Sequence, residues 1–141
     1  MDEHAFRRIL DAHLEAENAH NIAGTLATLT QDCLFEDVPL GQVYRGHDGA
    51  ERYYRIWWDA FSTTALPETL YLTPQGVAVA EVRFRGVHTG PFLGIEPTSR
   101  EVDLPTAIVV TFRDGLMAGE RMYWDMGTLL RQLGVAALPP L

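Results

Sequence analysis

The sequence predicts an α+β fold in which a curved, mostly antiparallel sheet wraps around a long N-terminal helix. Helical spacing of apolar residues dominates the first half of the chain, whereas the pattern after Pro67 is almost entirely that of strands. Turn residues at 74–76 and 113–115 join consecutive strands, which favours antiparallel pairing. A sheet curved in this way would enclose one apolar pocket that is open at one end.

The predicted N-terminal helix covers residues 2–21. Phe6, Leu10 and Leu14 recur at four-residue spacing, and His13 lies on the same face. Good helix formers such as Ala, Arg, Glu and Leu fill the positions between them. This helix is therefore expected to present one face to the sheet.

Three short elements are expected next. A second helix is predicted over residues 25–29, after a break in the helical pattern. Residues 33–38 are predicted to form a strand, which Pro39 and Gly41 end. Residues 43–45 are interpreted as the hairpin partner of that strand.

A third helix is predicted over residues 48–61, and its first residue, an aspartate, is a plausible N-cap. Its aromatic residues form two stripes, one with Tyr53 and Trp57 and the other with Tyr54 and Trp58. So much aromatic surface on one helix needs two coverings. We expect the domain core to cover one stripe and a partner subunit to cover the other.

The second half of the chain is predicted to be a run of strands with little helix. The elements are strands over 68–72 and 77–88, a loop over 89–100, a hairpin over 101–125, a helix over 127–133 and a tail over 134–141. The loop is rich in Gly and Pro and is well placed to act as a lid. The tail is expected to be ordered only where it docks.

Composition restricts the classes of function. At 141 residues the chain is expected to form one domain with a substantial core. A net charge of −8 without a basic patch argues against nucleic-acid and anionic-membrane partners. The absence of Lys excludes Schiff-base catalysis. The single cysteine, Cys33, excludes an intramolecular disulfide, and the N-terminus lacks the apolar core of a signal peptide, so a cytoplasmic location is expected.

Asp125 is the first candidate for catalysis. It ends a mostly hydrophobic strand, on which it shares one face with Met117, Gly119, Arg121 and Tyr123. Desolvation there would raise the pKa of the carboxyl group and make it a base. The alternative is that this aspartate caps the helix that follows or simply faces solvent.

Further polar residues are candidates for the pocket. His88 falls on the apolar face of its strand beside Phe84, where it could orient Asp125 or share its proton, although a core histidine is the alternative. Asp37 is expected either at the pocket mouth or in an Asx-type bond that holds the next turn. Arg121 would lower the pKa of Asp125 if buried beside it, or bind an anionic substrate group.

A histidine and carboxylate pattern on the first helix has the chemistry of metal ligands. His13, Glu17 and His20 are spaced i, i+4 and i+7, and such groups suit zinc or iron. The spacing lacks the His-Glu-x-x-His pattern, so no metal is expected and His13 is interpreted as a polar pocket residue. Tyr53 and Trp57 are interpreted as core residues or as walls that stack on a substrate.

Five segments carry a resemblance to a known family: His88–Gly94, Pro97–Arg100, Phe112–Gly115, Tyr123–Asp125 and Leu130–Gly134. With the order of elements, they resemble the SnoaL-like polyketide (ester) cyclase group of the nuclear-transport-factor-two-like superfamily. The resemblance implies a cystatin-like α+β cone. In these cyclases an Asp at the end of the final strand is the acid/base of an intramolecular aldol ring closure, and the resemblance implies that role for Asp125.

Two relatives on the same fold qualify this expectation. Residues 35–41 look like the segment that carries the ketosteroid isomerase base, which would place Asp37 at the pocket mouth. That enzyme also needs a Tyr and a second, protonated Asp as oxyanion donors. His13 and Ile108 stand near those positions, so steroid isomerisation is not expected. Limonene-epoxide-hydrolase-like enzymes pair their Asp with an Arg and another Asp on a neighbouring strand, but residues 83–85 contain no Asp.

The leading hypothesis is a cofactor-independent enzyme that uses general acid/base catalysis on a hydrophobic, enolisable carbonyl compound. Asp125 and His88 would carry the chemistry. Substrate contacts are expected from His13, Asp37, Tyr53, Phe84, Trp57, Ile108 and Arg121. The alternatives are an epoxide-hydrolase-like enzyme and a non-catalytic small-molecule-binding or dimerisation domain. A homodimer through the convex face of the sheet is expected from the habit of the family.

Overall fold

The computed structural model describes residues 2–135 and shows an α+β architecture. The elements, in chain order, are α1 (Glu3–Asn18), α2 (Ile22–Ala27), β1 (Leu29–Asp37), β2 (Gln42–Arg45), α3 (Gly46–Phe61), β3 (Thr64–Leu72), β4 (Val77–Val87), β5 (Glu101–Arg113), β6 (Leu116–Tyr123) and α4 (Met126–Leu133). The predicted tail over 134–141 lies mostly outside the described residues.

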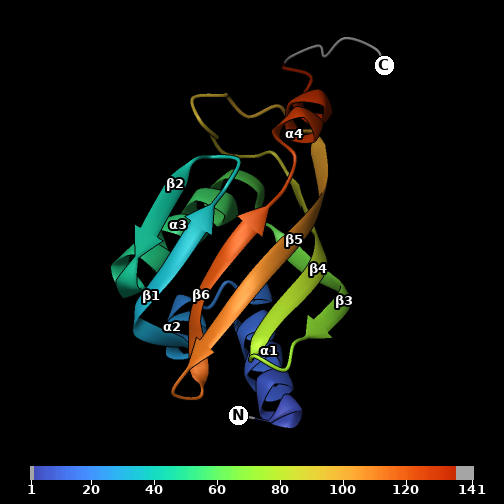
Figure 1. The fold of residues 1–141 in the computed structure, drawn as a ribbon. Helices are drawn as coiled ribbons and strands as arrows, with labels where there is room; N and C mark the ends of the chain where they lie inside the picture. The colour runs from blue at the N-terminus through green and yellow to red at the C-terminus, as the bar shows by residue number, and fades with distance from the viewer. Residues whose placement is uncertain (1, 136–141) are drawn as a thin grey trace.

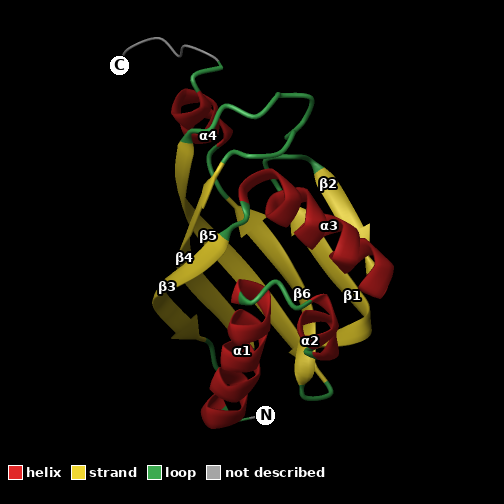
Figure 2. Ribbon diagram, turned by 180° about the vertical axis from the view of Figure 1, so that it is seen from behind, coloured by secondary structure: helices red, strands yellow, loops and turns green. Residues whose placement is uncertain are grey.

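The strands form one curved sheet of six strands in the order β2-β1-β6-β5-β4-β3. All neighbours pair antiparallel except β1 and β6, which are parallel. Helices α1, α2 and α3 cover one face of the sheet and lie in the foreground of Figure 2, whereas the other face of the sheet is in the foreground of Figure 1. The predicted fold, a curved and mostly antiparallel sheet around a long N-terminal helix, is therefore confirmed.

Local sequence signals explain most of the element boundaries. The side chain of Asp2 caps α1 by accepting a hydrogen bond from the Ala5 amide at 2.8 Å, and Asn21 caps α2 in the same way. The β5–β6 turn has positive φ at Asp114 and Gly115, as a tight two-residue hairpin requires.

Several predicted boundaries are wrong: α2 spans Ile22–Ala27 in place of 25–29, and β1 begins at Leu29 in place of residue 33. Two further differences have identifiable reasons. Helix α3 begins at Gly46, so Asp48 lies inside the first turn and is not the N-cap. Strand β3 begins at Thr64 and runs through Pro67. Because β3 is an edge strand and its register shifts between Pro67 and Thr69, the proline costs no central ladder bond.

Strand β6 contains a bulge that reverses the expected side-chain alternation. Thr111 pairs with Gly119 but Phe112 pairs with Met117, so Ala118 is an extra residue. Met117 therefore points to the helix-covered face together with Glu120, Met122 and the following Trp124. The prediction that Met117 shares a face with Asp125 is wrong.

The core lies between the helices and the concave face of the sheet. Its largest fully buried side chains include Phe35, Phe61 and Leu129. Gly86 brings β4 against the end of α3, because a Cβ there would lie 2.2 Å from the carbonyl oxygen of Phe61. None of the described helices is long and apolar enough to cross a membrane.

Both aromatic stripes of α3 are covered within this chain. Tyr54 and Trp58 are 4% and 8% exposed. The imidazole ring of His20 stacks on Trp58 with ring centroids 4.8 Å apart, and the α1 residue His13 contacts Tyr54. The expectation that a partner subunit must cover the second stripe is therefore wrong, because the N-terminal helical segment covers it.

Candidate functional site

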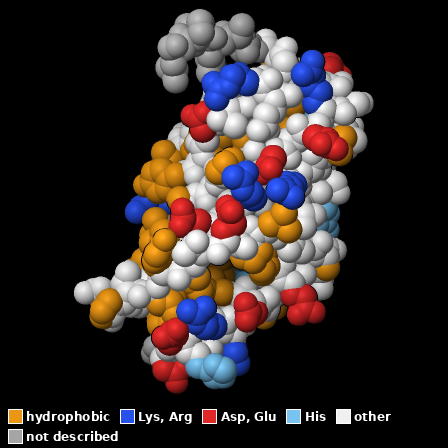
Figure 3. Space-filling model, turned by 90° about the vertical axis from the view of Figure 1, so that its right-hand side faces the viewer, with side chains coloured by type: hydrophobic (Ala, Val, Ile, Leu, Met, Phe, Trp, Pro, Cys, Tyr) orange, Lys and Arg blue, Asp and Glu red, His pale blue; other side chains and the backbone are white. Residues whose placement is uncertain are grey.

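A two-part cavity lies between the helices and the concave face of the sheet. The outer part, here called the vestibule, has a volume of about 330 Å³. Arg7 and Asp11 of α1 and Glu68 of β3 line it with apolar residues between them. On the side shown in Figure 3, apolar side chains show at the surface between Arg and Asp or Glu side chains. Strands β4, β5 and β6 supply the apolar wall, which includes Phe84, Ile108 and Met117.

The inner part, here called the chamber, is smaller, and about half of its lining residues are aromatic. Its volume is about 40 Å³. Glu17 and Phe84 line both the chamber and the vestibule, so the two parts meet at these side chains. The aromatic residues of the chamber are Tyr53, Tyr54, Trp57, Trp58, Phe84 and Trp124.

His13 lies at the centre of a buried hydrogen-bond network. The Thr28 hydroxyl donates to the carbonyl oxygen of Thr25 at 2.6 Å, so its oxygen must accept from Nδ1 of His13, 2.7 Å away. Nε2 of His13 consequently carries a lone pair and accepts from the Tyr54 hydroxyl at 2.7 Å. Burial lowers the pKa of His13 to about 4, which keeps the imidazole neutral at pH 7.

Two glutamates meet at the same imidazole nitrogen. Glu17 Oε2 lies 3.8 Å and Glu120 Oε1 lies 3.5 Å from His13 Nε2, and the two carboxyl-bearing side chains are only 14% and 9% exposed. Glu17 comes from α1 and Glu120 from β6.

Their environment separates the protonation states of the two glutamates. Burial raises the pKa of the Glu17 carboxyl to about 7. Burial, followed by the charge of Glu17, raises the pKa of Glu120 well above its usual range. At neutral pH the pair can therefore present one carboxylate and one carboxylic acid, which is the arrangement that acid–base catalysis needs.

Asp37 is a fully buried carboxylate that ties the chamber wall together. It accepts hydrogen bonds from the Tyr53 hydroxyl at 2.6 Å and from Nε1 of Trp124 at 3.0 Å. The amide of Leu40 donates to Asp37 at 3.0 Å, which is the Asx-type bond expected for the turn. Asp37 lines neither the vestibule nor the chamber, so it lies behind the wall and fixes the side chains that form it.

Asp125 is placed differently from the sequence-based expectation. Its carboxylate caps α4 by accepting from the Thr128 amide at 2.8 Å and the Thr128 hydroxyl at 2.7 Å. The side chain is 71% exposed. These hydrogen bonds lower the pKa of Asp125. The expectation of a desolvated carboxyl with a raised pKa is therefore wrong, and the capping alternative describes what the structure shows.

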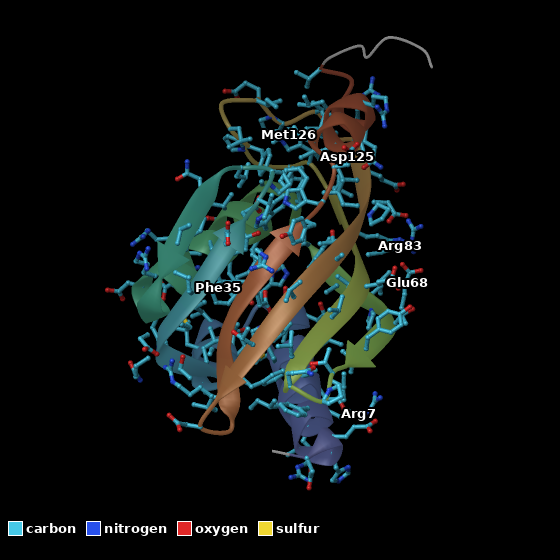
Figure 4. All side chains as sticks on the ribbon, in the orientation of Figure 1. Arg7, Phe35, Glu68, Arg83, Asp125 and Met126 are labelled. Atoms are coloured by element: carbon cyan, nitrogen blue, oxygen red, sulfur yellow. The ribbon has the colours of Figure 1, made fainter. Side chains whose placement is uncertain are left out.

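Asp125 is also remote from the mouth of the cavity. It borders a shallow depression in the surface and lines neither the vestibule nor the chamber. In Figure 4 it lies near α4 at the top of the view, whereas Arg7 of the vestibule lies near the bottom. The reason is the strand alternation, because Asp125 follows the exposed residues Arg121 and Tyr123 of β6.

His88 anchors the loop that follows β4. Its Nδ1 accepts from the amide of Thr98 at 3.2 Å, and its ring lies 5.1 Å from that of Phe61. No hydrogen bond joins His88 to Asp125 within residues 2–135, and His88 lines neither part of the cavity. The alternative of a core histidine fits this placement.

The other predicted site residues divide into two groups. Arg121 is exposed, and its guanidinium lies 5.8 Å from the ring centroid of Tyr123 outside the cavity. Five predicted substrate-contacting residues do line the cavity: His13, Tyr53, Trp57, Phe84 and Ile108.

The three residues of the predicted metal-ligand pattern, His13, Glu17 and His20, do not converge on one point. His20 points away from the glutamates and hydrogen-bonds the carbonyl oxygen of Thr63 at 2.8 Å. In the part of the chain that the structure describes, no group of three or more His, Cys, Asp or Glu side chains is arranged to hold a metal ion.

Sequence reasoning did not identify the glutamate pair. Glu120 alternates with Met122 and Trp124 on an apolar strand face, and an isolated acid on such a face was the available signal. Glu17 stands out in the sequence only as a possible metal ligand. Its partner comes from a strand more than a hundred residues later, so no local spacing connects the two.

The family model for SnoaL-like polyketide cyclase matches residues 7–133 of this chain. None of the curated proteins compared with the sequence matches it. Among solved structures, TsrD from Streptomyces laurentii is 25% identical, with a TM-score of 0.84 over 96% of this chain and 99% of that one.

Two further structures share the fold. A protein from Jannaschia sp. CCS1 described as SnoaL-like polyketide cyclase is 19% identical, with a TM-score of 0.85 over 96% of this chain and 95% of that one. SalBIII, an epoxide hydrolase/cyclase-like enzyme of pyran ring formation in the polyether salinomycin, is 18% identical, with a TM-score of 0.76 over 90% of this chain and 95% of that one.

Proposed function

Because the chain belongs to the SnoaL-like polyketide cyclase family, we propose that it is a cofactor-independent enzyme that acts on an enolisable carbonyl compound by acid–base catalysis in the cavity. Glu17 and Glu120 are the proposed acid–base pair. The observation that carries the proposal is that both carboxyl groups lie within 4 Å of one neutral imidazole nitrogen in an apolar cavity.

The proposed reaction begins with proton removal by Glu17. Its carboxylate takes a proton from the carbon next to the substrate carbonyl and leaves an enolate. The enolate carbon then forms a bond to the carbon atom of a second carbonyl group. Glu120, which is protonated, gives its proton to the oxygen of that second carbonyl group. Ring closure results when both carbonyl groups belong to one molecule. Return of the proton to a different carbon would instead give isomerisation.

The surroundings support this division of roles. A charged carboxylate in an apolar cavity is a stronger base than in water, because the neutral acid is favoured there. Tyr54 donates to His13 and not to either glutamate, so it does not lower the basicity of the pair. A base in this position contributes about a hundred- to ten-thousand-fold to the rate, and orientation in the vestibule must supply the rest.

The same pair supports a second candidate, hydrolytic or cyclising opening of an epoxide. A carboxylic acid can protonate the epoxide oxygen while the carboxylate activates the attacking hydroxyl. The observation that favours this candidate is that two buried carboxyl groups, both with raised pKa values, lie within 4 Å of one imidazole nitrogen. The comparison with SalBIII, which shares the fold, makes epoxides a reasonable part of any substrate screen.

Deuterium exchange tests the proposal without knowledge of the natural substrate. The protein is incubated in D₂O with a panel of enolisable ketones, and mass spectrometry measures the deuterium gained next to the carbonyl. The wild-type protein is expected to accelerate exchange of at least one ketone, and Glu17→Gln is expected to abolish the acceleration. Unaccelerated exchange across the panel, or equal acceleration by Glu17→Gln, would contradict the proposal and favour a binding domain.

We also propose that the protein forms a homodimer through the convex face of the sheet. Exposed apolar residues on or near the strands, such as Leu34, Tyr71 and Tyr123, support this proposal. Light scattering with size-exclusion chromatography gives the mass in solution, and a monomer at micromolar concentration would contradict it.

A further inference from the structure

Thr28 contacts the candidate site from behind the cavity wall. It is the C-cap residue of α2, is 6% exposed, and lines neither the vestibule nor the chamber. Its hydroxyl oxygen lies 2.7 Å from Nδ1 of His13, whereas the other ring nitrogen of His13 faces Glu17 and Glu120. The Met117 amide of β6 donates to the backbone carbonyl of Thr28 at 2.9 Å, which ties Thr28 to the strand that carries Glu120.

The hydrogen bonds that pass through His13 can run in one direction only. The chain leads from the Tyr54 hydroxyl through the imidazole and the Thr28 hydroxyl to the carbonyl oxygen of Thr25. A carbonyl oxygen cannot donate, so the Thr28 hydroxyl proton must lie on that side. Nδ1 of the neutral imidazole therefore carries the ring proton, and Nε2 has none to give to a carboxylate.

The other tautomer of His13 would change the charge of the two glutamates. With a proton on Nε2, the imidazole would present a donor 3.5 Å from Glu120 and 3.8 Å from Glu17. A hydrogen bond to a carboxylate stabilises its charged form and lowers its pKa. The Tyr54 hydroxyl would also lose its acceptor and become free to donate to a carboxylate. Both changes would favour two carboxylates in place of one carboxylate and one carboxylic acid.

The other titratable groups near the pair do not supply such a donor at neutral pH. Burial raises the pKa values of the Tyr53 and Tyr54 phenols of α3 well above their usual range, and raises the pKa of the Cys33 thiol of β1 to about 11. The remaining charged residues of the cavity line the vestibule only: Arg7, Asp11 and Glu68. The tautomer of His13 is therefore the polar contact through which the pair can be changed.

We infer that Thr28 is a positioning residue, which holds His13 in the tautomer with its proton on Nδ1 and thereby keeps a proton on one of the two glutamates at neutral pH. This inference rests on the proposed function and adds to it a residue outside the cavity that controls the acid–base pair. Thr28 acts through the imidazole and does not contact the substrate.

Substitutions of two neighbouring threonines separate this role from a purely structural one. Thr28→Val keeps the shape of the side chain and removes the hydroxyl, whereas Thr28→Ser keeps the hydroxyl. Thr25→Val is the matched control, because the Thr25 hydroxyl donates to the carbonyl oxygen of Asn21 at 2.8 Å and not to His13. Thr28→Cys, whose thiol is only a weak acceptor, takes the place of Thr28→Val if that variant does not fold.

¹⁵N spectra of the imidazole groups report the tautomer without any substrate. Protonated and unprotonated ring nitrogens resonate in separate regions, and sequential assignment identifies His13 among the five histidines. At pH 7 the wild-type protein, Thr28→Ser and Thr25→Val are expected to carry the proton on Nδ1, and Thr28→Val is expected to carry it on Nε2. A protonated Nε2 in the wild-type protein, or the wild-type tautomer in Thr28→Val, would overturn the inference.

A ¹³C titration of the Glu17 carboxyl group measures the effect on the pair. Its midpoint is expected at about pH 7 in the wild-type protein, where burial raises the pKa. Thr28→Val is expected to lower the midpoint by about one unit or more, because the new donor stabilises the carboxylate. Thr28→Ser and Thr25→Val are expected to keep the wild-type midpoint. An unchanged midpoint in Thr28→Val, or an equal decrease in Thr25→Val, would contradict the role of Thr28.

The outcomes also separate this inference from the proposed function, since neither spectrum depends on turnover. If the tautomer and the midpoint change as expected but the wild-type protein accelerates no ketone exchange, the role of Thr28 stands and the catalytic proposal is contradicted. If Glu17→Gln abolishes exchange while Thr28→Val alters neither spectrum, the reverse holds. In an active protein, the pH at which exchange reaches half its maximum is expected to fall in Thr28→Val together with the Glu17 midpoint.

Discussion

The carboxyl oxygen Oε1 of Glu120 lies 3.5 Å from Nε2 of His13, so an acid from the centre of β6 and an imidazole from α1 meet inside the cavity. That nitrogen already accepts the hydroxyl proton of Tyr54 at 2.7 Å. The imidazole therefore has no free lone pair in this state, and Glu120 keeps its proton for another acceptor.

Replacing Glu120 tests its part in the chemistry. Glu120→Gln keeps the shape and a donor but removes the transferable proton. Aldol ring closure of a simple diketone such as heptane-2,6-dione, the step in which Glu120 gives up its proton, is expected to slow by about a hundredfold or more. Mass spectrometry of the cyclised product measures this loss, and an unchanged circular dichroism spectrum shows that the variant is folded. Ring closure within a factor of about three of the wild-type rate would remove Glu120 from the mechanism.

The raised pKa of Glu17 predicts a pH dependence of stability. The pKa is about 7 in the folded protein, against 4.5 for an unperturbed glutamate, so the folded state holds the proton more tightly. The stabilisation is complete below pH 4.5, declines as pH rises from 4.5 to 7 and stays lost above that, on the order of 3 kcal/mol in all. Urea unfolding from pH 4.5 to 8 measures it.

Other groups titrate in the same window, so the comparison must isolate Glu17. His13, with its pKa lowered to about 4, contributes stability that is present above pH 6.5 and lost as pH falls towards 4, which opposes the effect of Glu17. The difference between Glu120→Gln and the double variant Glu17→Gln/Glu120→Gln removes both the His13 and the Glu120 contributions. A difference that does not change with pH would show that Glu17 titrates normally.

Removing the buried carboxylate of Asp37 is expected to destabilise the protein strongly. Asp37→Ala leaves the donors of Tyr53 and Trp124 unpaired, at a cost of about 3–5 kcal/mol. Tyr53→Phe removes one donor and leaves the carboxylate with its other partners, so its cost is expected to be roughly 1–2 kcal/mol. Chemical denaturation measures both, and equal costs would argue against Asp37 as the common acceptor.

Asp125 is expected to matter for stability and not for catalysis. Asp125→Ala removes the cap of α4 and should lower the melting temperature modestly. Asp125→Asn retains an acceptor for the Thr128 amide, so its melting temperature should lie close to that of the wild-type protein. Both variants are expected to exchange the responsive ketone at close to the wild-type rate. A hundredfold loss of exchange in folded Asp125→Asn would show that Asp125 takes part in catalysis.

The sequence carries enough information for the fold but not for the faces of β6. The helical spacing of Phe6, Leu10 and Leu14 and the turn at Asp114-Gly115 are local signals, and both correspond to observed elements. The bulge at Ala118 leaves no such mark, because any residue can occupy it. Strict alternation therefore placed Met117 on the wrong face. Asp125 was preferred to Glu120 because it ends a mostly hydrophobic strand, and the sequence does not show that its side chain turns to solvent there.

The remaining misassignments share one cause, which is tertiary contact. Trp58 was expected at a subunit interface because its helix carries too many aromatic residues for one core. His20 covers it, and that contact depends on how α1 and α3 meet in space. The pairing of Glu17 with Glu120 has the same origin. Periodicity predicts the face of a helix or strand on which a side chain lies, but it does not predict which residue of another element that side chain contacts.

The extra residue in β6 has a consequence for how such proteins diversify. When a strand gains or loses one residue after its turn, the side chains beyond that point move to the opposite face of the sheet. Side chains that were exposed to solvent then point into the interior, and those that pointed into the interior become exposed. The extra residue Ala118 therefore determines that Glu120 points into the cavity, without a substitution at any acidic position. Insertions and deletions in this hairpin can therefore create or silence reactivity, and a change in length there matters as much as a substitution at the reacting groups.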